Sequence, residues 1–145
     1  MMKLLAAILI FTSCTFKGAL NKEPYTSLPS YPVSKNIEEA WKSTLAFFNS
    51  KNIPVVHAEK SSEYIITAPV PVQCGNEADS DADIIIADTG NLPSTATARY
   101  KVKVTQVYGQ TTLIPTLEDI HTGDQSHAAK STGKLEKILS EYVNK

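Results

Sequence analysis

Long apolar runs are nearly absent from this 145-residue sequence, and the clearest one lies at the amino terminus. A helix that spans a bilayer needs roughly 20 apolar residues, and the run from Leu4 to Phe11 is far shorter. We therefore expect no membrane-spanning helix. An excess of one charge is also missing, because 14 basic residues face 15 acidic ones. This balance argues against nucleic acid as a partner, since nucleic-acid binding requires a basic face.

Motifs that identify enzymes are missing as well. The sequence contains no nucleophile elbow, no phosphate-binding loop and no dinucleotide fingerprint. His57, His121 and His127 lack the paired spacing of zinc ligands on a helix. We therefore expect no enzyme, and we assign no catalytic, cofactor-binding or metal-binding residue.

The amino terminus has the layout of a secretory leader. Lys3 precedes the apolar run, and the small polar residues Thr12 and Ser13 lead into Cys14. The stretch Phe11-Thr12-Ser13-Cys14 resembles the lipobox of bacterial lipoproteins, with Phe11 where leucine is usual. The resemblance implies that residues 1–13 are a signal peptide and that Cys14 carries the lipid anchor. The alternative is a plain secreted protein.

The resemblance also implies an address in the cell envelope. Thr15 follows the anchor position, whereas an aspartate there retains lipoproteins at the inner membrane in enteric-type sorting. We therefore expect the outer membrane, with the protein facing the periplasm.

The other cysteine, Cys74, is then an odd thiol in an oxidising compartment. Acidic residues follow it, and their field opposes the lowered pKa that a nucleophilic thiol requires. We expect Cys74 to act as a small buried apolar residue. A disulfide to another chain or to a small thiol is the alternative.

Residues 14–33 have the composition of a flexible tether that begins at the lipidated cysteine. They contain three prolines among Ser, Thr, Lys and Asn, with no helical or strand period. The alternative is a segment that folds onto a partner through Tyr25 and Tyr31.

Residues 34–145 are expected to form a single domain that begins and ends with a helix. Asn36 can cap the first helix, with Glu39 three residues later, and Lys51-Asn52 ends it. Ser131 or Thr132 can cap the last helix. Apolar residues at helical spacing support both helices: Ile37, Ala40, Trp41, Leu45 and Phe48 in the first, and Leu135, Ile138, Leu139, Tyr142 and Val143 in the last.

Several strands are expected between these helices. Ile53–Ala58 and Tyr64–Ala68 flank a polar turn, as in a hairpin, and Pro69 and Pro71 end the second strand. Ile84–Ala87 is a weaker strand candidate. Apolar and polar residues alternate strictly from Ala98 to Thr105, and Tyr108-Gly109-Gln110 then turns the chain into Thr111–His121.

The order of elements predicts an α+β fold. We expect an antiparallel sheet of about four to five strands, with both helices packed on one face. The opposite face would carry Arg99, Lys101 and Lys103, either solvated or in contact with a partner.

Two stretches resemble BamC-like outer-membrane lipoproteins. The first is Ala40-Trp41 followed by Ile53–Lys60 and Tyr64–Thr67, which looks like their repeat domain, and the second is Ser131–Glu136, which is similar to a helix start of related envelope lipoproteins. The turn lacks the glycine expected near Ser62-Glu63, and one such domain fits here where BamC has two. The resemblance implies a helix-grip domain with a scaffold role and no catalysis.

An acidic segment echoes the first half of a calcium-binding loop, with Asp79, Asp81 and Asp83 at alternate positions. Ile84 stands where the turn glycine belongs, and Gly90 where the bidentate glutamate belongs. We therefore expect a solvated acidic loop and no cation.

The sequence thus favours a lipid-anchored structural or assembly module whose partners are the membrane and another envelope protein. The sheet edge, the basic row or the tether would bind that protein. The alternative is a small-ligand-binding lipoprotein with a pocket between helices and sheet, its ligand unknown.

Overall fold

The structure is a computed structural model, and it describes residues 29–75, 81–86, 96–121 and 129–145. Within these ranges the chain forms two helices and nine strands. In chain order they are β1 (Tyr31–Pro32), α1 (Ile37–Ser50), β2 (Val55–Glu59), β3 (Tyr64–Thr67), β4 (Val70–Val72), β5 (Cys74–Gly75), β6 (Ile84–Ile86), β7 (Ala96–Val107), β8 (Gln110–His121), β9 (Ala129–Ser131) and α2 (Lys134–Val143).

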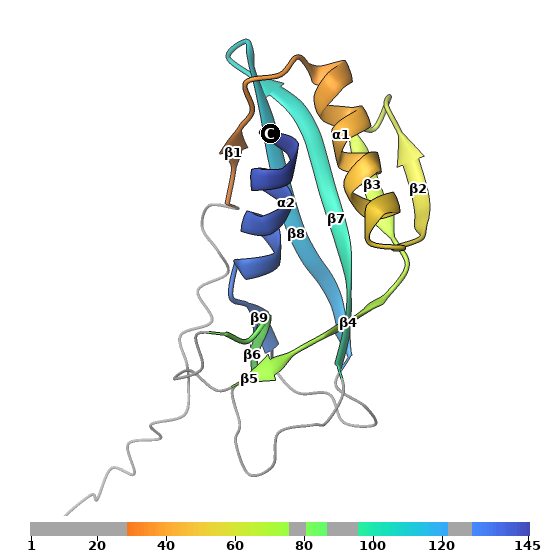
Figure 1. Cartoon of the computed structure of the whole chain (residues 1–145), viewed down its shortest axis with the longest axis vertical. Coiled ribbons are helices and arrows are strands. Elements are labelled where there is room, and N and C mark those ends of the chain that lie inside the picture. Colours follow the sequence, from red (N-terminus) through yellow and green to blue (C-terminus); the bar gives the residue numbers. More distant parts are fainter. Residues whose placement is uncertain (1–28, 76–80, 87–95, 122–128) are drawn as a thin grey trace, which may run out of the picture.

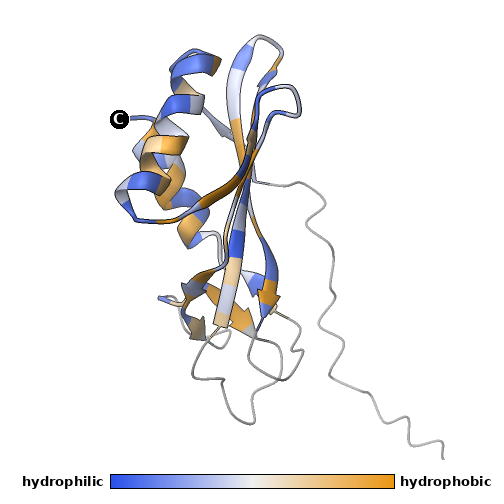
Figure 2. Cartoon of the chain, turned by 90° about the vertical axis from the view of Figure 1, so that its right-hand side faces the viewer, coloured by the Kyte–Doolittle hydropathy of each residue, from blue (hydrophilic) through white to orange (hydrophobic). Residues whose placement is uncertain are grey.

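The expected α+β class is confirmed, but the sheet is larger than expected. Strands β1-β8-β7-β3-β2 lie side by side in that order, and β4 also pairs with β7, which makes a six-stranded sheet. A second sheet of three short strands, β5-β6-β9, lies at one end of the molecule (Figure 1). Most pairs are antiparallel, the pair β5–β6 being parallel. Both helices cover the same face of the larger sheet, as expected (Figure 2).

The hairpin of β7 and β8 forms the centre of the sheet. The predicted alternation is confirmed up to Val104, because Ala98, Tyr100, Val102 and Val104 are buried while the residues between them are half-buried. Thr105, which we expected on the solvated face, is buried as well. Since successive side chains of a strand point to opposite faces, one face of β7 contacts the helices and the other bears the basic row. Strand β8 pairs with β7 antiparallel from Thr97 to the turn.

Strands β3 and β4 lie one after the other along the same edge of β7. Strand β3 ends at Thr67, before Pro69, as expected, but a further strand follows at once, because Pro71 lies within β4, opposite Thr97. Proline is tolerated there because β4 is an edge strand, whose second side needs no N–H donor. The Thr67 hydroxyl accepts a hydrogen bond from the Tyr100 N–H at 3.1 Å, in the gap between the two short strands.

The main core lies between the helices and the larger sheet. Its aromatic centre consists of Phe47, Phe48 and Tyr100, whose rings meet edge to face at centroid distances of 5.2 to 6.5 Å. Burying one such side chain contributes roughly 1.5–3 kcal/mol. A smaller cluster around Ile84 joins the second sheet to β4 and β7.

Helix α1 begins and ends as expected. The side chain of Asn36 accepts a hydrogen bond from the Glu39 N–H at 2.9 Å. Lys51 closes the helix, and Asn52 adopts a positive φ of 54° just beyond it.

Helix α2 differs from expectation at its cap and in its inner face. The N-cap position is held by Gly133, at φ 83°, while the hydroxyls of Ser131 and Thr132 accept hydrogen bonds from the N–H groups of Gly133 and Lys134. The buried residues of the helix are Glu136, Leu139, Ser140 and Val143. By contrast, Ile138 and Tyr142, which we expected on the core face, are exposed. The apolar residues of α2 therefore cover a wider part of the helix surface than the part that is buried.

The folded domain begins before residue 34. Tyr31 and Pro32 form β1, opposite Leu113 and Thr112 of β8, and Val33 is buried in the core. The proposed tether therefore ends before Tyr31, and Tyr31 pairs within its own chain. Two residues are too few to show a strand period in sequence.

Neither helix of the described ranges is long and apolar enough to cross a membrane.

The turn between β7 and β8 holds a tyrosine in an unfavourable backbone conformation. Val107 pairs with Gln110, which leaves a two-residue loop of Tyr108 (φ 50°) and Gly109 (φ 78°). Hairpins of this kind favour Asn-Gly, because asparagine tolerates positive φ and bulky residues do not.

We expect Tyr108→Asn to stabilise the protein by roughly 1 kcal/mol, because asparagine relieves the left-handed strain. Urea unfolding measures this, with Tyr108→Phe as the matched control that keeps an aromatic residue at the same φ. Equal stability of the two variants would show that the turn stores no such strain.

Candidate functional site

Strand β2 forms one outer edge of the larger sheet, and β1 forms the other. Strand β2 pairs with β3 on one side, and no strand of the described ranges lies on its other side. Every residue of β2 after Val55 is exposed, with Val56 exposed to 59%. An edge strand presents unpaired N–H and C=O groups that can pair with another chain.

A bulge interrupts this edge at Val56. Val55 pairs with Thr67 and His57 pairs with Ile66, so Val56 has no partner in β3. Bulges at sheet edges twist the strand and limit uncontrolled pairing. The regular part of the edge is therefore short, from His57 to Glu59.

The basic row on the outer face of the sheet is neutralised by neighbouring acids. Arg99 Nε lies 3.1 Å from Asp119 Oδ2, although it lacks hydrogen-bond alignment. Lys101 Nζ lies 3.3 Å from Glu118 Oε1.

Lys103 completes this pattern, with its Nζ 3.6 Å from Glu63 Oε2. Lys101 and Lys103 also lie over the ring of Tyr64, at 5.0 and 5.8 Å from its centroid. With each base paired in this way, the outer face is a poor candidate for binding an anionic partner.

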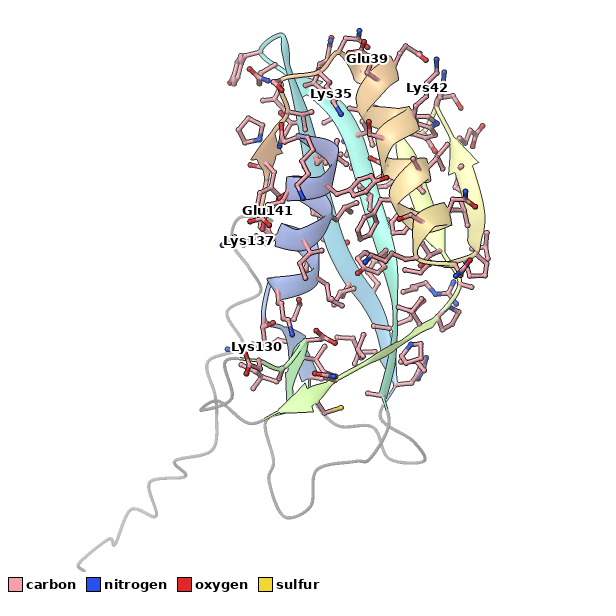
Figure 3. The ribbon with its side chains drawn as sticks, viewed as in Figure 1. Lys35, Glu39, Lys42, Lys130, Lys137 and Glu141 are labelled. Atoms are coloured by element: carbon pink, nitrogen blue, oxygen red, sulfur yellow. The ribbon has the colours of Figure 1, made fainter. Side chains whose placement is uncertain are left out.

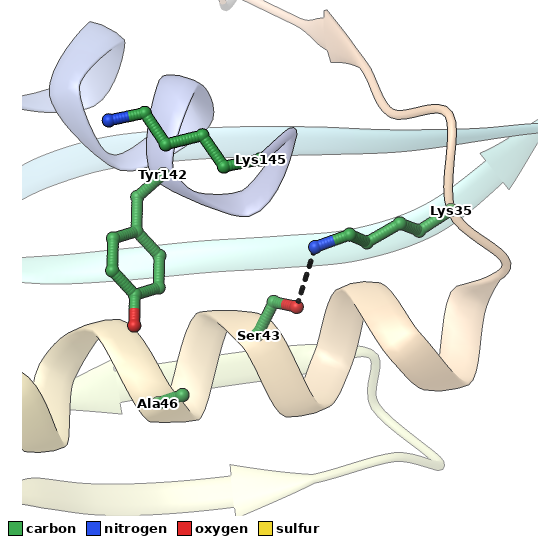
Figure 4. Close-up of a pocket in the computed structure, with 5 residues that line it drawn as sticks. All are labelled: Lys35, Ser43, Ala46, Tyr142 and Lys145. Carbon is green, nitrogen blue, oxygen red and sulfur yellow. Dashed lines mark hydrogen bonds between the residues drawn. The ribbon is translucent and has the colours of Figure 1, made fainter.

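A shallow hollow of about 320 Å³ lies between α1 and α2. Its lining consists of Lys35, Ser43, Ala46, Tyr142 and Lys145 (Figure 4). Lys35 Nζ donates a hydrogen bond to Ser43 Oγ at 3.3 Å. The Tyr142 ring packs edge-on against Phe47, at a centroid distance of 5.3 Å. The hollow lies between the two helices, whereas the ligand-binding alternative placed its pocket between helices and sheet.

The outward face of the helix layer carries charges of both signs. Figure 3 labels Lys35, Glu39 and Lys42 at the start of α1, and Lys137 and Glu141 on α2. Lys137 and Glu141 are one turn apart and 3.9 Å from each other. Interspersed charges of this kind are typical of a solvated face.

Glu136 is a buried carboxyl group that the sequence pattern does not reveal. It is 3% exposed on the inner face of α2, and its Oε2 atom has no hydrogen-bond partner. Burial raises the pKa of Glu136, the nearby Asp83 raises it further, and a hydrogen bond with the Ser131 side chain partly opposes both. Burial and the charges of Glu136 and Asp83 also raise the pKa of Tyr100. Burial and Glu136 raise that of Tyr31.

Asp83 is 7% exposed and links two segments, whereas we expected it in a solvated loop. Its Oδ2 accepts a hydrogen bond from the Gln73 N–H at 2.8 Å, and its Oδ1 lies 3.7 Å from Lys134 Nζ. Among the residues that the structure describes, no three or more His, Cys, Asp or Glu residues are grouped to hold a metal ion. Asp79 lies outside those residues.

The remaining candidates are placed separately. Cys74 is half-buried in β5, where burial, and secondarily Asp83, raises the pKa of its thiol. His57 is exposed on β2, with Nε2 3.8 Å from Glu59 Oε2, and His121 is exposed at the end of β8. Cys14, Tyr25 and His127 lie outside the described residues.

No known protein family matches the chain, and no curated protein matches its sequence. The resemblance to BamC-like lipoproteins therefore stays a prediction.

Three features of the surface and core escaped the sequence analysis. Val56 and Tyr108 were grouped with ordinary strand and turn residues, and Glu136 was placed on no face. A tyrosine in place of asparagine before Gly109 was the one available signal, because the Asn-Gly preference of short hairpins is readable from sequence.

We expect Glu136→Gln to abolish a loss of stability that the native protein shows as pH rises. The folded pKa of Glu136 is raised above its ordinary value of 4.5, so the folded chain binds this proton more tightly than the unfolded chain. Stability from this group is therefore complete below the unfolded pKa and is lost as pH rises through the folded pKa.

Urea unfolding from about pH 5 to about pH 8 tests this sign. Across that range the free energy of unfolding of the native protein should fall relative to that of Glu136→Gln. Glu141→Gln, which removes an exposed carboxylate from the same helix, should follow the native protein. A parallel pH profile for native protein and Glu136→Gln would contradict the expectation.

Proposed function

We propose that this protein is a lipoprotein of the bacterial envelope, anchored by acyl chains on Cys14, whose folded domain binds another envelope protein. The proposed site of binding is the free edge of β2, which would pair with an extended segment of the partner. The proposed address is the outer membrane, with the domain facing the periplasm. No catalytic step is part of the proposal.

The observation that carries the binding surface is that the β2 residues after Val55 are exposed and that no strand of the described ranges pairs with their outer side. The other faces of the sheet are less suited to a protein partner. Two helices cover one face, and ion pairs neutralise the basic row on the other. Backbone pairing at an edge requires no large apolar patch, because main-chain hydrogen bonds supply the affinity.

A contact through the β2 edge is expected to be weak, and a weak contact is sufficient for a protein that is anchored to the same membrane as its partner. Each added hydrogen bond contributes only ~0.5–1.5 kcal/mol net, and the regular edge is short. Confinement to one membrane raises the effective concentration of both partners, so that a weak contact suffices.

A second candidate function rests on the hollow between α1 and α2. Two lysines, Lys35 and Lys145, and Tyr142 are among its lining residues, and this composition suits a small anionic ligand. It is the weaker candidate because the hollow is open and the space between helices and sheet is occupied by core residues such as Trp41, Phe48 and Leu139.

We expect Cys14→Ser to release the protein from membranes, because each buried methylene of an acyl chain contributes ~0.8 kcal/mol to anchoring. Cell fractionation with a carbonate wash measures the distribution, and Cys74→Ser is the matched control. A Cys14→Ser protein that still sediments with membranes would rule out the anchor.

We expect Val56→Lys to abolish partner binding and to leave the fold intact, because a lysine on an edge strand opposes the pairing of a further strand. In-cell cross-linking and mass spectrometry of the membrane fraction measure the partners. Ile138→Lys places the same charge on an exposed site of α2 and should retain them. Identical partners for both variants would exclude the β2 edge as the binding surface.

A further inference from the structure

The tip of the β7–β8 hairpin combines exposure with a complete lack of charge. No charged residue occurs between Lys103 and Glu118, in a chain of which 20% is charged. Tyr108 at the tip is 105% exposed and Val107 beside it is 42% exposed. The flanking Gln106 and Gln110 are also exposed.

The tip extends past the strands on either side. The last residue of β7 that pairs with β3 is Lys103, and the last residue of β1, Pro32, pairs with Thr112. Figure 1 shows the turn at the upper end of the molecule, far from the small sheet of β5, β6 and β9. Tyr108 is also held at a positive φ of 50°, which a bulky residue rarely adopts. A strained residue that makes no internal packing contribution points to a role outside the fold.

We propose that this tip contacts the surface of a neutral phospholipid bilayer, with the Tyr108 ring and Val107 at the level of the headgroups. Tyrosine suits that depth, because its ring is apolar and its hydroxyl can bind water or ester oxygens. The glutamine amides on each side supply further hydrogen bonds. The absence of lysine and arginine at the tip indicates neutral headgroups and not anionic ones.

A bilayer fits the tip better than a protein partner does. A stable protein interface takes roughly 800 Å² from each side and about 20 to 30 residues. The tip offers one aromatic and one aliphatic side chain, which is too little for such an interface. It is enough to orient a domain that another part of the chain already holds at the membrane.

The position of β1 makes this contact reachable, and at this step the inference rests on the proposed anchor at Cys14. Tyr31 pairs with Leu113, which is five residues from Tyr108, or roughly 17 Å along the strand. The Val33 carbonyl accepts a hydrogen bond from Gln110 Nε2 at 2.7 Å, beside the turn. The chain between Cys14 and Tyr31 can span roughly 50 Å when extended, so lipid and tip can meet the same bilayer.

The test replaces the natural anchor and so does not depend on acylation. A polyhistidine tag takes the place of residues 1–14 and binds phosphatidylcholine vesicles that contain a nickel-chelating lipid. Tyr108→Trp and Val107→Trp each report the depth of the tip by quenching from brominated phosphatidylcholine. The native protein supplies the background, because its single tryptophan, Trp41, is 7% exposed. His121→Trp reports the opposite end of β8.

For both tip variants we expect the tryptophan emission to shift to shorter wavelength and to be strongly quenched. The fluorescence of His121→Trp should be quenched no more than that of the native protein. Circular dichroism checks that each variant folds, and Val107→Trp keeps the test valid if tryptophan disturbs position 108. Vesicle-bound protein without extra quenching at the tip would overturn the proposal, as would equal quenching at both ends. If the tip binds a protein and not lipid, the protein should bind the vesicles without extra quenching at the tip. Release of Cys14→Ser from cell membranes tests the anchor separately.

Discussion

Strand β7 is bonded on both sides, and the register of this strand governs the rest of the molecule. Strand β8 accompanies it on one side, while β3 and β4 share the other. A slip by one residue would bury the basic row and expose Tyr100, Val102 and Val104, because side chains alternate between faces. The same register brings Arg99, Lys101 and Lys103 to their acidic neighbours. Core packing and surface charge are therefore consequences of one pairing.

This pairing also determines which surfaces remain for partners. The helices occupy the face that bears the apolar side chains of β7, and paired charges occupy the other face. Exposed backbone is left at the edge strand β2, and exposed apolar side chains are left at the hairpin tip. Both features lie at the periphery of the sheet, where a contact can form without disturbing the core. A protein held near a membrane can use weak contacts of this kind, because confinement compensates for low affinity.

Much of the fold was predictable because its main elements have strong local patterns. Helix α1 combines helical apolar spacing with the Asn36 cap, and β7 alternates over most of its length. The strands that the sequence analysis missed are β1, β4, β5 and β9, which have two or three residues each. So few residues show no period, and Pro71 argued against pairing. These segments are strands only because they pair with longer or better-defined neighbours: β1 with β8, β4 with β7, and β5 and β9 with β6.

The candidate site was less predictable than the fold. By itself the sequence determined the α+β class, the position of both helices and the central hairpin, because these depend on residues close together in the chain. Tertiary structure alone decided that the basic row is neutralised, that Glu136 is buried and that Val56 and Tyr108 are exposed. The physical reason is that charge pairing and burial depend on residues distant in sequence. Lys101 and Glu118, for example, are brought together by the β7–β8 register, and no local pattern contains that contact.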